Sequence, residues 1–270
     1  MQHIVIPAVI VGSLGLLAAA MLYTASKIFH TRENPLVKKI EALLPGANCG
    51  ACGYPGCSGF AEAMANEQNP ELVCPVAPAE TMKQIGELVG LALGQGGAKK
   101  AVLLCQGSNE AARKICEYHG IEDCLSASLL FGGDKACQYA CFGLGTCVEV
   151  CPFGAISLTD GIVTIDEQTC TGCGKCVPAC PRNVLALRPA GHRVLVACRS
   201  KDKGGQTRKN CKKGCIGCRK CVKACEFDAI TMDGALARID DSKCTRCGAC
   251  VQACPTGAIV AMNQQKEEAV

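Results

Sequence analysis

Large aromatic side chains are scarce in this 270-residue chain, which has no tryptophan, four tyrosines and six phenylalanines. A chain of this kind has little with which to fill an apolar core, and small segments without one need a disulfide or a metal centre to stay folded. Cysteine, by contrast, is abundant, with 25 residues. The composition therefore predicts a fold built around cysteine chemistry.

Charged residues are missing from Ile4 to Thr24, an apolar stretch of 21 residues that would reach about 31 Å as a helix. No lysine or arginine precedes it, which argues against a secretory signal peptide, whereas basic residues from Lys27 onward follow it. We expect a single-pass transmembrane helix in the inner (plasma) membrane, in contact with lipid over residues 4–24, with the bulk of the chain on the cytoplasmic side. A buried core helix is the alternative. Because the stretch has no Asp, Glu, Lys or Arg, we expect no ion path in it.

Thiols that face the cytoplasm stay reduced, so we expect metal binding and not disulfides. Sixteen of the cysteines form two copies of one pattern. The second copy contains Cys215-x2-Cys218-x2-Cys221-x3-Cys225 and Cys244-x2-Cys247-x2-Cys250-x3-Cys254. The first contains Cys137-x3-Cys141-x5-Cys147-x3-Cys151 and Cys170-x2-Cys173-x2-Cys176-x3-Cys180. Cysteines of the first copy precede their counterparts by 74 positions, as at Cys151, Cys170 and Cys180, which indicates a duplicated supersecondary unit.

This spacing lets three thiolates surround one cubane while the fourth cysteine turns to the neighbouring cubane. Structural zinc uses two separated pairs of ligands, so zinc is the weaker alternative. The predicted ligand sets are Cys137, Cys141, Cys147 and Cys180 for cluster 2; Cys170, Cys173, Cys176 and Cys151 for cluster 3; Cys215, Cys218, Cys221 and Cys254 for cluster 4; and Cys244, Cys247, Cys250 and Cys225 for cluster 5.

A less regular set, Cys49-x2-Cys52-x4-Cys57-x16-Cys74, lies upstream. Its glycines and the Tyr54-Pro55 turn suit a loop folded around a cubane, which we take as cluster 1. Zinc or inert buried thiols are the alternatives. Five cysteines remain, and for an additional cluster 6 we expect Cys105, Cys124, Cys198 and Cys211, with Cys116 left as a buried thiol. The cofactors expected are thus five or six [4Fe–4S] clusters.

The fold class expected is α+β. The predicted order of parts is a transmembrane anchor (1–26), a four-cysteine [4Fe–4S] domain (27–93), a strand and helix insertion with the additional cluster (94–135), a first ferredoxin-like repeat (136–190), a basic connector (191–212) and a second ferredoxin-like repeat (213–270).

Turn and cap signals predict the elements within these parts. Asp160-Gly161 and Asp233-Gly234, each between apolar runs, predict one hairpin per repeat. Helices are expected over 35–44, 79–92, 108–119 and 122–131, with a flexible linker at 94–97. Similar apolar runs at 101–105 and 193–198 suggest two strands that could pair with each other.

The formal charge of +4 changes once clusters are counted. Each four-thiolate [4Fe–4S] centre carries about −2, so five or six would leave the protein near −6 to −8. We therefore do not expect nucleic-acid binding. A basic run is expected to offset cluster charge or to dock an acidic redox partner, or else to be an ordinary solvated loop; it comprises Arg199, Lys201, Lys203, Arg208, Lys209, Lys212 and Lys213.

The sequence shows no nucleophile–base pair, no phosphate-binding glycine loop and no nicotinamide or flavin fingerprint. The four histidines are scattered. The chain itself is therefore expected to carry electrons, with no catalytic residue of its own.

An apolar N-terminal stretch followed by NCGACGYPGC, then CPFGAI, GCIGCRKC and CTRCGACVQACPTGAI, resembles the B subunit of the Rnf-type ion-translocating ferredoxin:NAD oxidoreductase complexes, in its long form. The resemblance covers essentially the whole chain. It implies a translocase component that takes electrons from reduced ferredoxin and passes them to membrane-embedded and flavin-bearing subunits, with export of Na⁺ or H⁺. The alternative is a membrane-tethered polyferredoxin that serves another redox enzyme without ion coupling.

Overall fold

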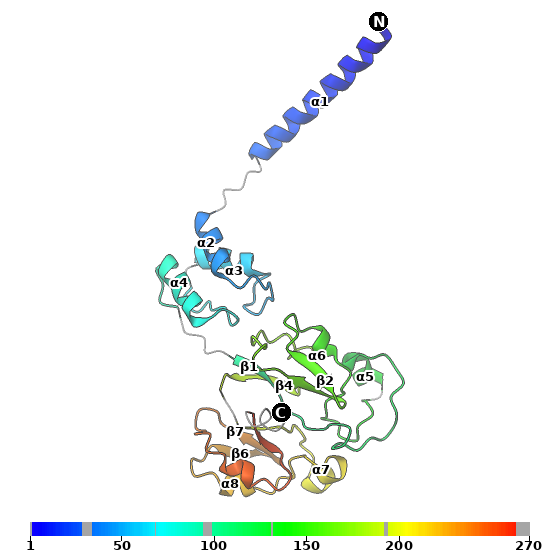
Figure 1. Ribbon diagram of the computed structural model, residues 1–270, viewed down its shortest axis with the longest axis vertical. Coiled ribbons are helices and arrows are strands. Elements are labelled where there is room, and N and C mark those ends of the chain that lie inside the picture. The colour runs from blue at the N-terminus through cyan, green and yellow to red at the C-terminus, as the bar shows by residue number, and fades with distance from the viewer. Residues whose placement is uncertain are drawn as a thin grey trace, which may run out of the picture.

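The computed structural model describes residues 2–28, 34–67, 69–93, 99–130, 132–191 and 194–262. Figure 1 shows its elements spread along one long axis, from helix α1 (Gln2–Ile28) at one end, through a unit of three helices, to the strand-containing part at the other. The linker expected at 94–97 lies outside the described residues.

Helix α1 covers the predicted apolar stretch. Across the described residues, no helix has both the length and the apolarity required to traverse a lipid bilayer. The prediction of an N-terminal transmembrane helix is therefore wrong on this finding.

The helical unit has an ordinary apolar core. It consists of α2 (Pro35–Leu43), α3 (Cys57–Glu67) and α4 (Ala79–Val89). Asn34 caps α2 as expected, because its side chain accepts a hydrogen bond from the Leu36 N–H at 3.0 Å. The three helices enclose residues that are 0–1% exposed, namely Ile40, Phe60, Ala61, Met64 and Ile85.

Each repeat contains the predicted hairpin. In the first repeat, β2 (Ile156–Thr159) pairs antiparallel with β3 (Ile162–Ile165) around Asp160-Gly161. In the second, β6 (Ile230–Asp233) pairs with β7 (Leu236–Ile239) around Gly234. Both predicted hairpins are confirmed, since these turns need the positive φ angles that Asp160, Gly161 and Gly234 adopt. One-turn helices carry cysteines beside the hairpins: α6 (Thr146–Glu149), α8 (Lys220–Lys223) and α9 (Ala249–Gln252).

The two apolar runs outside the repeats form strands, but they do not pair with each other. Strand β1 (Lys99–Leu103) pairs with β4 (Leu185–Pro189), and β5 (Val194–Val196) pairs with β8 (Ile259–Ala261). The suggested pairing was wrong because each run supplies the partner for the last strand of the repeat that follows it. The two runs still meet, in a small buried cluster of Val102, Leu104, Leu195 and Ala197 that joins the repeats.

No helix forms over 108–119, contrary to prediction. Here Ala112 bridges to Cys211 and Lys114 bridges to Lys135, and the Arg113 N–H donates to the Asn210 carbonyl at 2.9 Å. These long-range backbone hydrogen bonds take the groups that a helix would use, so tertiary pairing overrides helix propensity. The helix expected at 122–131 is shorter, as α5 (Cys124–Leu130), and the connector forms α7 (Gly204–Asn210).

Candidate iron–sulfur sites

The second repeat brings together the two ligand sets that its motifs predict. Site 4 is a recess whose wall includes Cys215, Cys218, Cys221 and Cys254. Site 5 is a second recess whose wall includes Cys225, Cys244, Cys247 and Cys250. In each case three cysteines come from one motif and the fourth comes from the other, which is the exchange that the spacing indicates.

Site 3 lies in the first repeat. Burial, followed by the nearby thiolates of Cys170 and Cys173 and more weakly that of Cys151, raises the pKa of Cys176 to about 11. These four residues are the set predicted for cluster 3. Strand β1 closes the site from outside the repeat, because the Ala101 N–H donates to the Cys170 sulfur at 3.4 Å.

Site 2 differs from the prediction in one residue. Its recess is lined by Cys124, Cys141, Cys147 and Cys180, so Cys124 stands where Cys137 was expected. Burial, followed by the thiolates of Cys141, Cys124 and Cys180, raises the pKa of Cys147 to about 12. The sequence contains an indication of this exchange. Leu144 lies 74 positions before Cys218, so the first repeat has a leucine where the second has a cysteine ligand, and it needs one ligand from elsewhere.

The start of α5 fixes Cys124 beside α6. The Cys124 N–H donates to the Thr146 hydroxyl at 2.7 Å, and that hydroxyl donates to the Asp123 carboxylate at 2.8 Å. Asp123 also accepts from the Ser126 N–H at 2.7 Å, as a capping residue does. These hydrogen bonds lower the pKa of the Asp123 carboxyl, so it is held as an anion at neutral pH.

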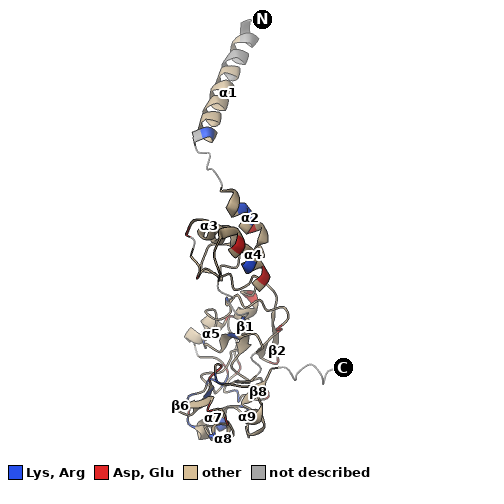
Figure 2. Cartoon of the chain, turned by 90° about the vertical axis from the view of Figure 1, so that its left-hand side faces the viewer, with Lys and Arg blue, Asp and Glu red and all other residues tan. Residues whose placement is uncertain are grey.

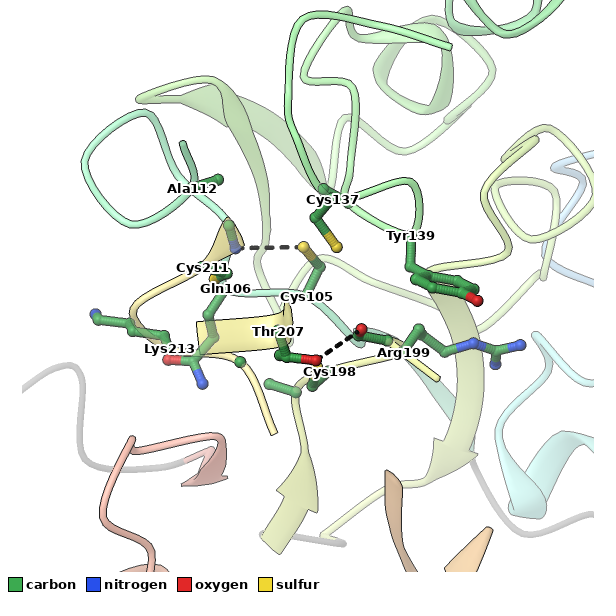
Figure 3. Close-up of a pocket in the computed structure, with 15 residues that line it drawn as sticks. Cys105, Gln106, Ala112, Cys137, Tyr139, Cys198, Arg199, Thr207, Cys211 and Lys213 are labelled. Atoms are coloured by element: carbon green, nitrogen blue, oxygen red, sulfur yellow. Dashed lines mark hydrogen bonds between the residues drawn. The ribbon is translucent and has the colours of Figure 1, made fainter. Parts of the chain in front are cut away.

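Site 6 receives the residue that site 2 does not use. Its recess is lined by Cys105, Cys137, Cys198 and Cys211, and Figure 3 shows the sulfurs of Cys105 and Cys137 turned toward one another. Cys105 and Cys198 follow β1 and β5, while Cys137 and Cys211 are 74 positions apart. Each half of the molecule thus supplies one cysteine that follows a strand and one of the two cysteines related by the 74-residue offset. The set predicted for cluster 6 contained Cys124, but this residue lines the site 2 recess, and Cys137 lines site 6 in its place.

Site 1 is formed by the loop before α3. Burial raises the pKa of Cys74, and the thiolates of Cys52 and Cys49 add to this. Asn48 adopts φ 46° and accepts a hydrogen bond from the Cys57 N–H at 2.7 Å, which folds the loop back on α3. Cys52, Cys57 and Cys74 all pack against the core of the helical unit.

Cys116 is the one cysteine that none of these six sets contains. It was expected to be buried, but its side chain is exposed. The reason is the missing helix over 108–119, which leaves this part of the chain as an irregular surface segment.

The recesses suit a bulky group held by thiolates. Sites 6, 2, 4 and 5 each place four thiols around one recess. Across the described residues, no three His, Cys, Asp or Glu side chains are spaced to share a single metal ion. Burial is the main cause that raises the pKa of Cys137, Cys141, Cys198 and Cys221 to about 11. Such thiols ionise readily only where a metal supplies positive charge.

Charge is unevenly placed over the molecule. Figure 2 shows residues of both signs on α2 and α4, whereas α7 and α8 carry basic residues only. From the basic run, Arg199 and Lys213 line site 6, and Lys201 lies 3.6 Å from the carboxylate of Asp233.

Paired four-thiol sites, duplicated on small hairpins, define a ferredoxin-type iron–sulfur electron carrier. The sequence families agree. Residues 140–184 and 214–258 match the family described as "4Fe-4S dicluster domain", and residues 44–76 match the FeS family, described as "Putative Fe-S cluster". Cys105, Cys198 and Cys211 fall outside all three matches, as do Cys124 and Cys137.

Full-length relatives are more specific. The chain is 44% identical over 280 residues to the B subunit of the proton-translocating ferredoxin:NAD(+) oxidoreductase complex of Clostridium ljungdahlii, covering 100% of this chain and 99% of the relative. It is 43% identical over 251 residues to the B subunit of the ion-translocating oxidoreductase complex of Methanosarcina acetivorans, covering 93% and 95%. It is 43% identical over 260 residues to the B subunit of the Na(+)-translocating ferredoxin:NAD(+) oxidoreductase complex of Acetobacterium woodii, covering 96% and 78%.

The chain therefore belongs to the B-subunit family of ion-translocating ferredoxin:NAD oxidoreductase complexes. The resemblance drawn from the sequence is confirmed, and with it the prediction of an electron-relay component in a multi-subunit oxidoreductase complex.

Proposed function

We propose that this chain takes electrons from reduced ferredoxin and passes them to flavin-bearing and membrane-embedded subunits of its complex, through six [4Fe–4S] clusters. The complex uses the fall in electron energy to move Na⁺ or H⁺, through partner subunits. The observation that carries the proposal is site 6, a four-thiol recess shared by both repeats, because it joins two two-cluster units into one carrier.

The proposed ligand sets follow the recesses at sites 2, 4, 5 and 6 and the neighbouring thiols at sites 1 and 3. They are Cys49, Cys52, Cys57 and Cys74 for site 1; Cys124, Cys141, Cys147 and Cys180 for site 2; Cys151, Cys170, Cys173 and Cys176 for site 3; Cys215, Cys218, Cys221 and Cys254 for site 4; Cys225, Cys244, Cys247 and Cys250 for site 5; and Cys105, Cys137, Cys198 and Cys211 for site 6. A bound [4Fe–4S] cluster supplies reversible one-electron chemistry.

The chain's own part is to position and shield these sulfurs. Backbone N–H groups donate to them, as from Gly107 to Cys105 at 3.3 Å and from Ala101 to Cys170 at 3.4 Å. Such hydrogen bonds stabilise negative charge on sulfur and so favour the reduced state. Burial of Cys141, Cys147, Cys170 and Cys176 keeps water from their sites.

The proposed location is the cytoplasmic side of the membrane, docked on the membrane-embedded partners. The support is chemical: reduced thiols persist on that side, and none of the 25 cysteines forms a disulfide. Nucleic acid is not a partner in this proposal, because six bound clusters would outweigh the formal charge of +4.

Metal and sulfide analysis of the full-length chain purified without oxygen tests the cofactors. We expect a brown protein with about 24 iron atoms and as many acid-labile sulfides. A colourless protein that contains zinc and no sulfide would refute the proposal.

For the activity, ferredoxin-dependent NAD reduction is measured with the intact complex in sealed vesicles. Ion uptake must accompany it, and electron transfer without uptake would favour a polyferredoxin that serves another enzyme.

A further inference from the structure

A buried lysine lies between sites 2 and 6. Only 5% of Lys135 is exposed, and its Nζ donates to the carbonyl oxygens of Gly107 at 2.7 Å, Cys141 at 2.9 Å and Gly161 at 2.7 Å. Three acceptors use three N–H donors, which only the protonated ammonium group has. Lys135 is therefore a positive charge fixed in the interior, and no carboxylate pairs with it among the described residues.

Lys135 acts on one thiol from each of the two sites. Its Nζ lies 2.9 Å from the carbonyl oxygen of Cys141, in site 2. It also lies 2.7 Å from the carbonyl oxygen of Gly107, whose N–H donates to the Cys105 sulfur of site 6 at 3.3 Å. The same charge that favours a thiolate also favours the added electron of a reduced cluster, because both are negative charge on the same sulfurs.

Arg182 is a second cation at the same boundary. It lines the site 2 recess, its guanidinium carbon lies 4.4 Å from the centre of the Phe142 ring, and it donates to the Gly132 carbonyl. Burial lowers the pKa of Arg182, while the thiolates of Cys137 in site 6 and Cys180 in site 2 oppose this. Its Nε is buried and has no hydrogen-bond acceptor among the described residues, so one N–H remains free at the recess wall.

We propose that Lys135 and Arg182 are a pair of fixed charges that raise the reduction potentials of the clusters in sites 2 and 6. The inference rests on the proposed function. Two adjacent cubanes, each with a charge of about −2, repel further electrons. A buried lysine and a half-buried arginine between them relieve that repulsion, and burial limits the screening of Lys135 by water and salt. Both residues act through the clusters' surroundings and bind no iron themselves.

The second repeat lacks this arrangement and so provides the control. Lys209 occupies the position 74 residues after Lys135, but its side chain is exposed. Thr256 occupies the position 74 residues after Arg182, and it is neutral. An exposed charge is screened by solvent, so Lys209 should have little influence on cluster potentials.

The test is a redox titration of the full-length, cluster-loaded chain, followed by electron paramagnetic resonance, with iron counted in each variant. Lys135→Met removes the charge and keeps the length of the side chain. At a fixed applied potential, we expect the ratio of reduced to oxidised cluster to fall about tenfold at two clusters, which corresponds to about 59 mV for one electron. The matched control, Lys209→Met, should titrate like wild type.

Lys135→Met leaves three carbonyls without a donor and could disturb folding. A second variant therefore separates the loss of charge from misfolding. Arg182→Gln removes a charge but retains an amide donor, and it should shift potentials in the same direction. Full iron content with unchanged potentials in either variant would overturn the proposal. Loss of iron from both variants would also overturn it, since the residues would then hold the sites together without tuning them. Wild-type protein without iron would instead refute the proposed function.

Discussion

The backbone N–H of Cys215 donates to the sulfur of Cys198 at 3.3 Å. The same relationship occurs in the other half, where the N–H of Cys141 donates to the sulfur of Cys105 at 3.5 Å, and the two donors are 74 positions apart. In each half, the cysteine at the same repeat position thus supports a cysteine that follows a strand outside the motif. The two halves of site 6 therefore use the same local hydrogen-bond geometry, as expected for a site shared by two related units.

The exchange between Cys124 and Cys137 can be tested by counting iron. Cys137→Ala and Cys211→Ala should each remove about four iron atoms, and the double variant should also lose only about four, because both residues serve site 6. Iron and acid-labile sulfide per chain are the measurements. A double variant that loses about eight would place Cys137 in another site, as its spacing to Cys141 first predicted.

Cys116 should be dispensable for the clusters. Its side chain is exposed and lies in none of the six sites, so Cys116→Ser should keep its full iron content and wild-type electron transfer. In the loaded wild-type protein, a maleimide reagent should modify Cys116 first, as located by peptide mass spectrometry. Loss of iron from Cys116→Ser would show that it is a ligand.

Two glycines from matching cysteine motifs of the two repeats should differ in their tolerance of alanine: Gly172, between Cys170 and Cys173, and Gly248, between Cys247 and Cys250. Gly172 and Gly248 have φ of +74° and +80°, so alanine strains the backbone at both by about 1–2 kcal/mol. A methyl group at Gly172 would also overlap the Lys99 carbonyl oxygen, whereas one at Gly248 meets nothing within 4 Å.

Thermal unfolding of the two loaded variants measures this difference. We expect Gly172→Ala to be about 1–3 kcal/mol less stable than Gly248→Ala, since strand β1 must move to relieve the overlap. Equal losses of stability would mean that β1 does not close site 3 as described.

Removal of iron should unfold the repeats but not the helical unit. Cysteine side chains make up a large part of the buried core of each repeat. The helical unit instead has a core of larger apolar side chains such as Phe60 and Met64. After anaerobic chelation, hydrogen exchange should become fast at β2–β3 and β6–β7 and stay slow in α2–α4. Protected hairpins in the iron-free protein would contradict this.

The sequence predicted best where one local rule decides the structure. Asp160-Gly161 gave the turn of a hairpin, Asn34 gave the start of α2, and the ligand spacing from Cys215 to Cys254 matches the two recesses found there. In each case the determining residues lie within a few positions of one another or repeat at a fixed interval.

Prediction failed where a distant segment decides. Residues 108–119 have helical propensity, but their backbone groups bond to residues about a hundred positions later. The spacing of Cys137 to Cys141 resembled a motif, yet the absence of a cysteine at Leu144 and the position of Cys124 at the start of α5 decide the grouping. The apolar stretch at the N-terminus was judged by composition alone, which does not establish a membrane span.

Strand β1 pairs with β4, and both strands precede Cys198 and Cys211 in the chain. Two of the site 6 cysteines, Cys105 and Cys137, therefore emerge from the ribosome before the other two. Until Cys198 and Cys211 follow, these thiols lack half of their ligand set and are open to oxidation or to a stray metal ion. The order of synthesis thus makes this junction a vulnerable point in the maturation of the protein.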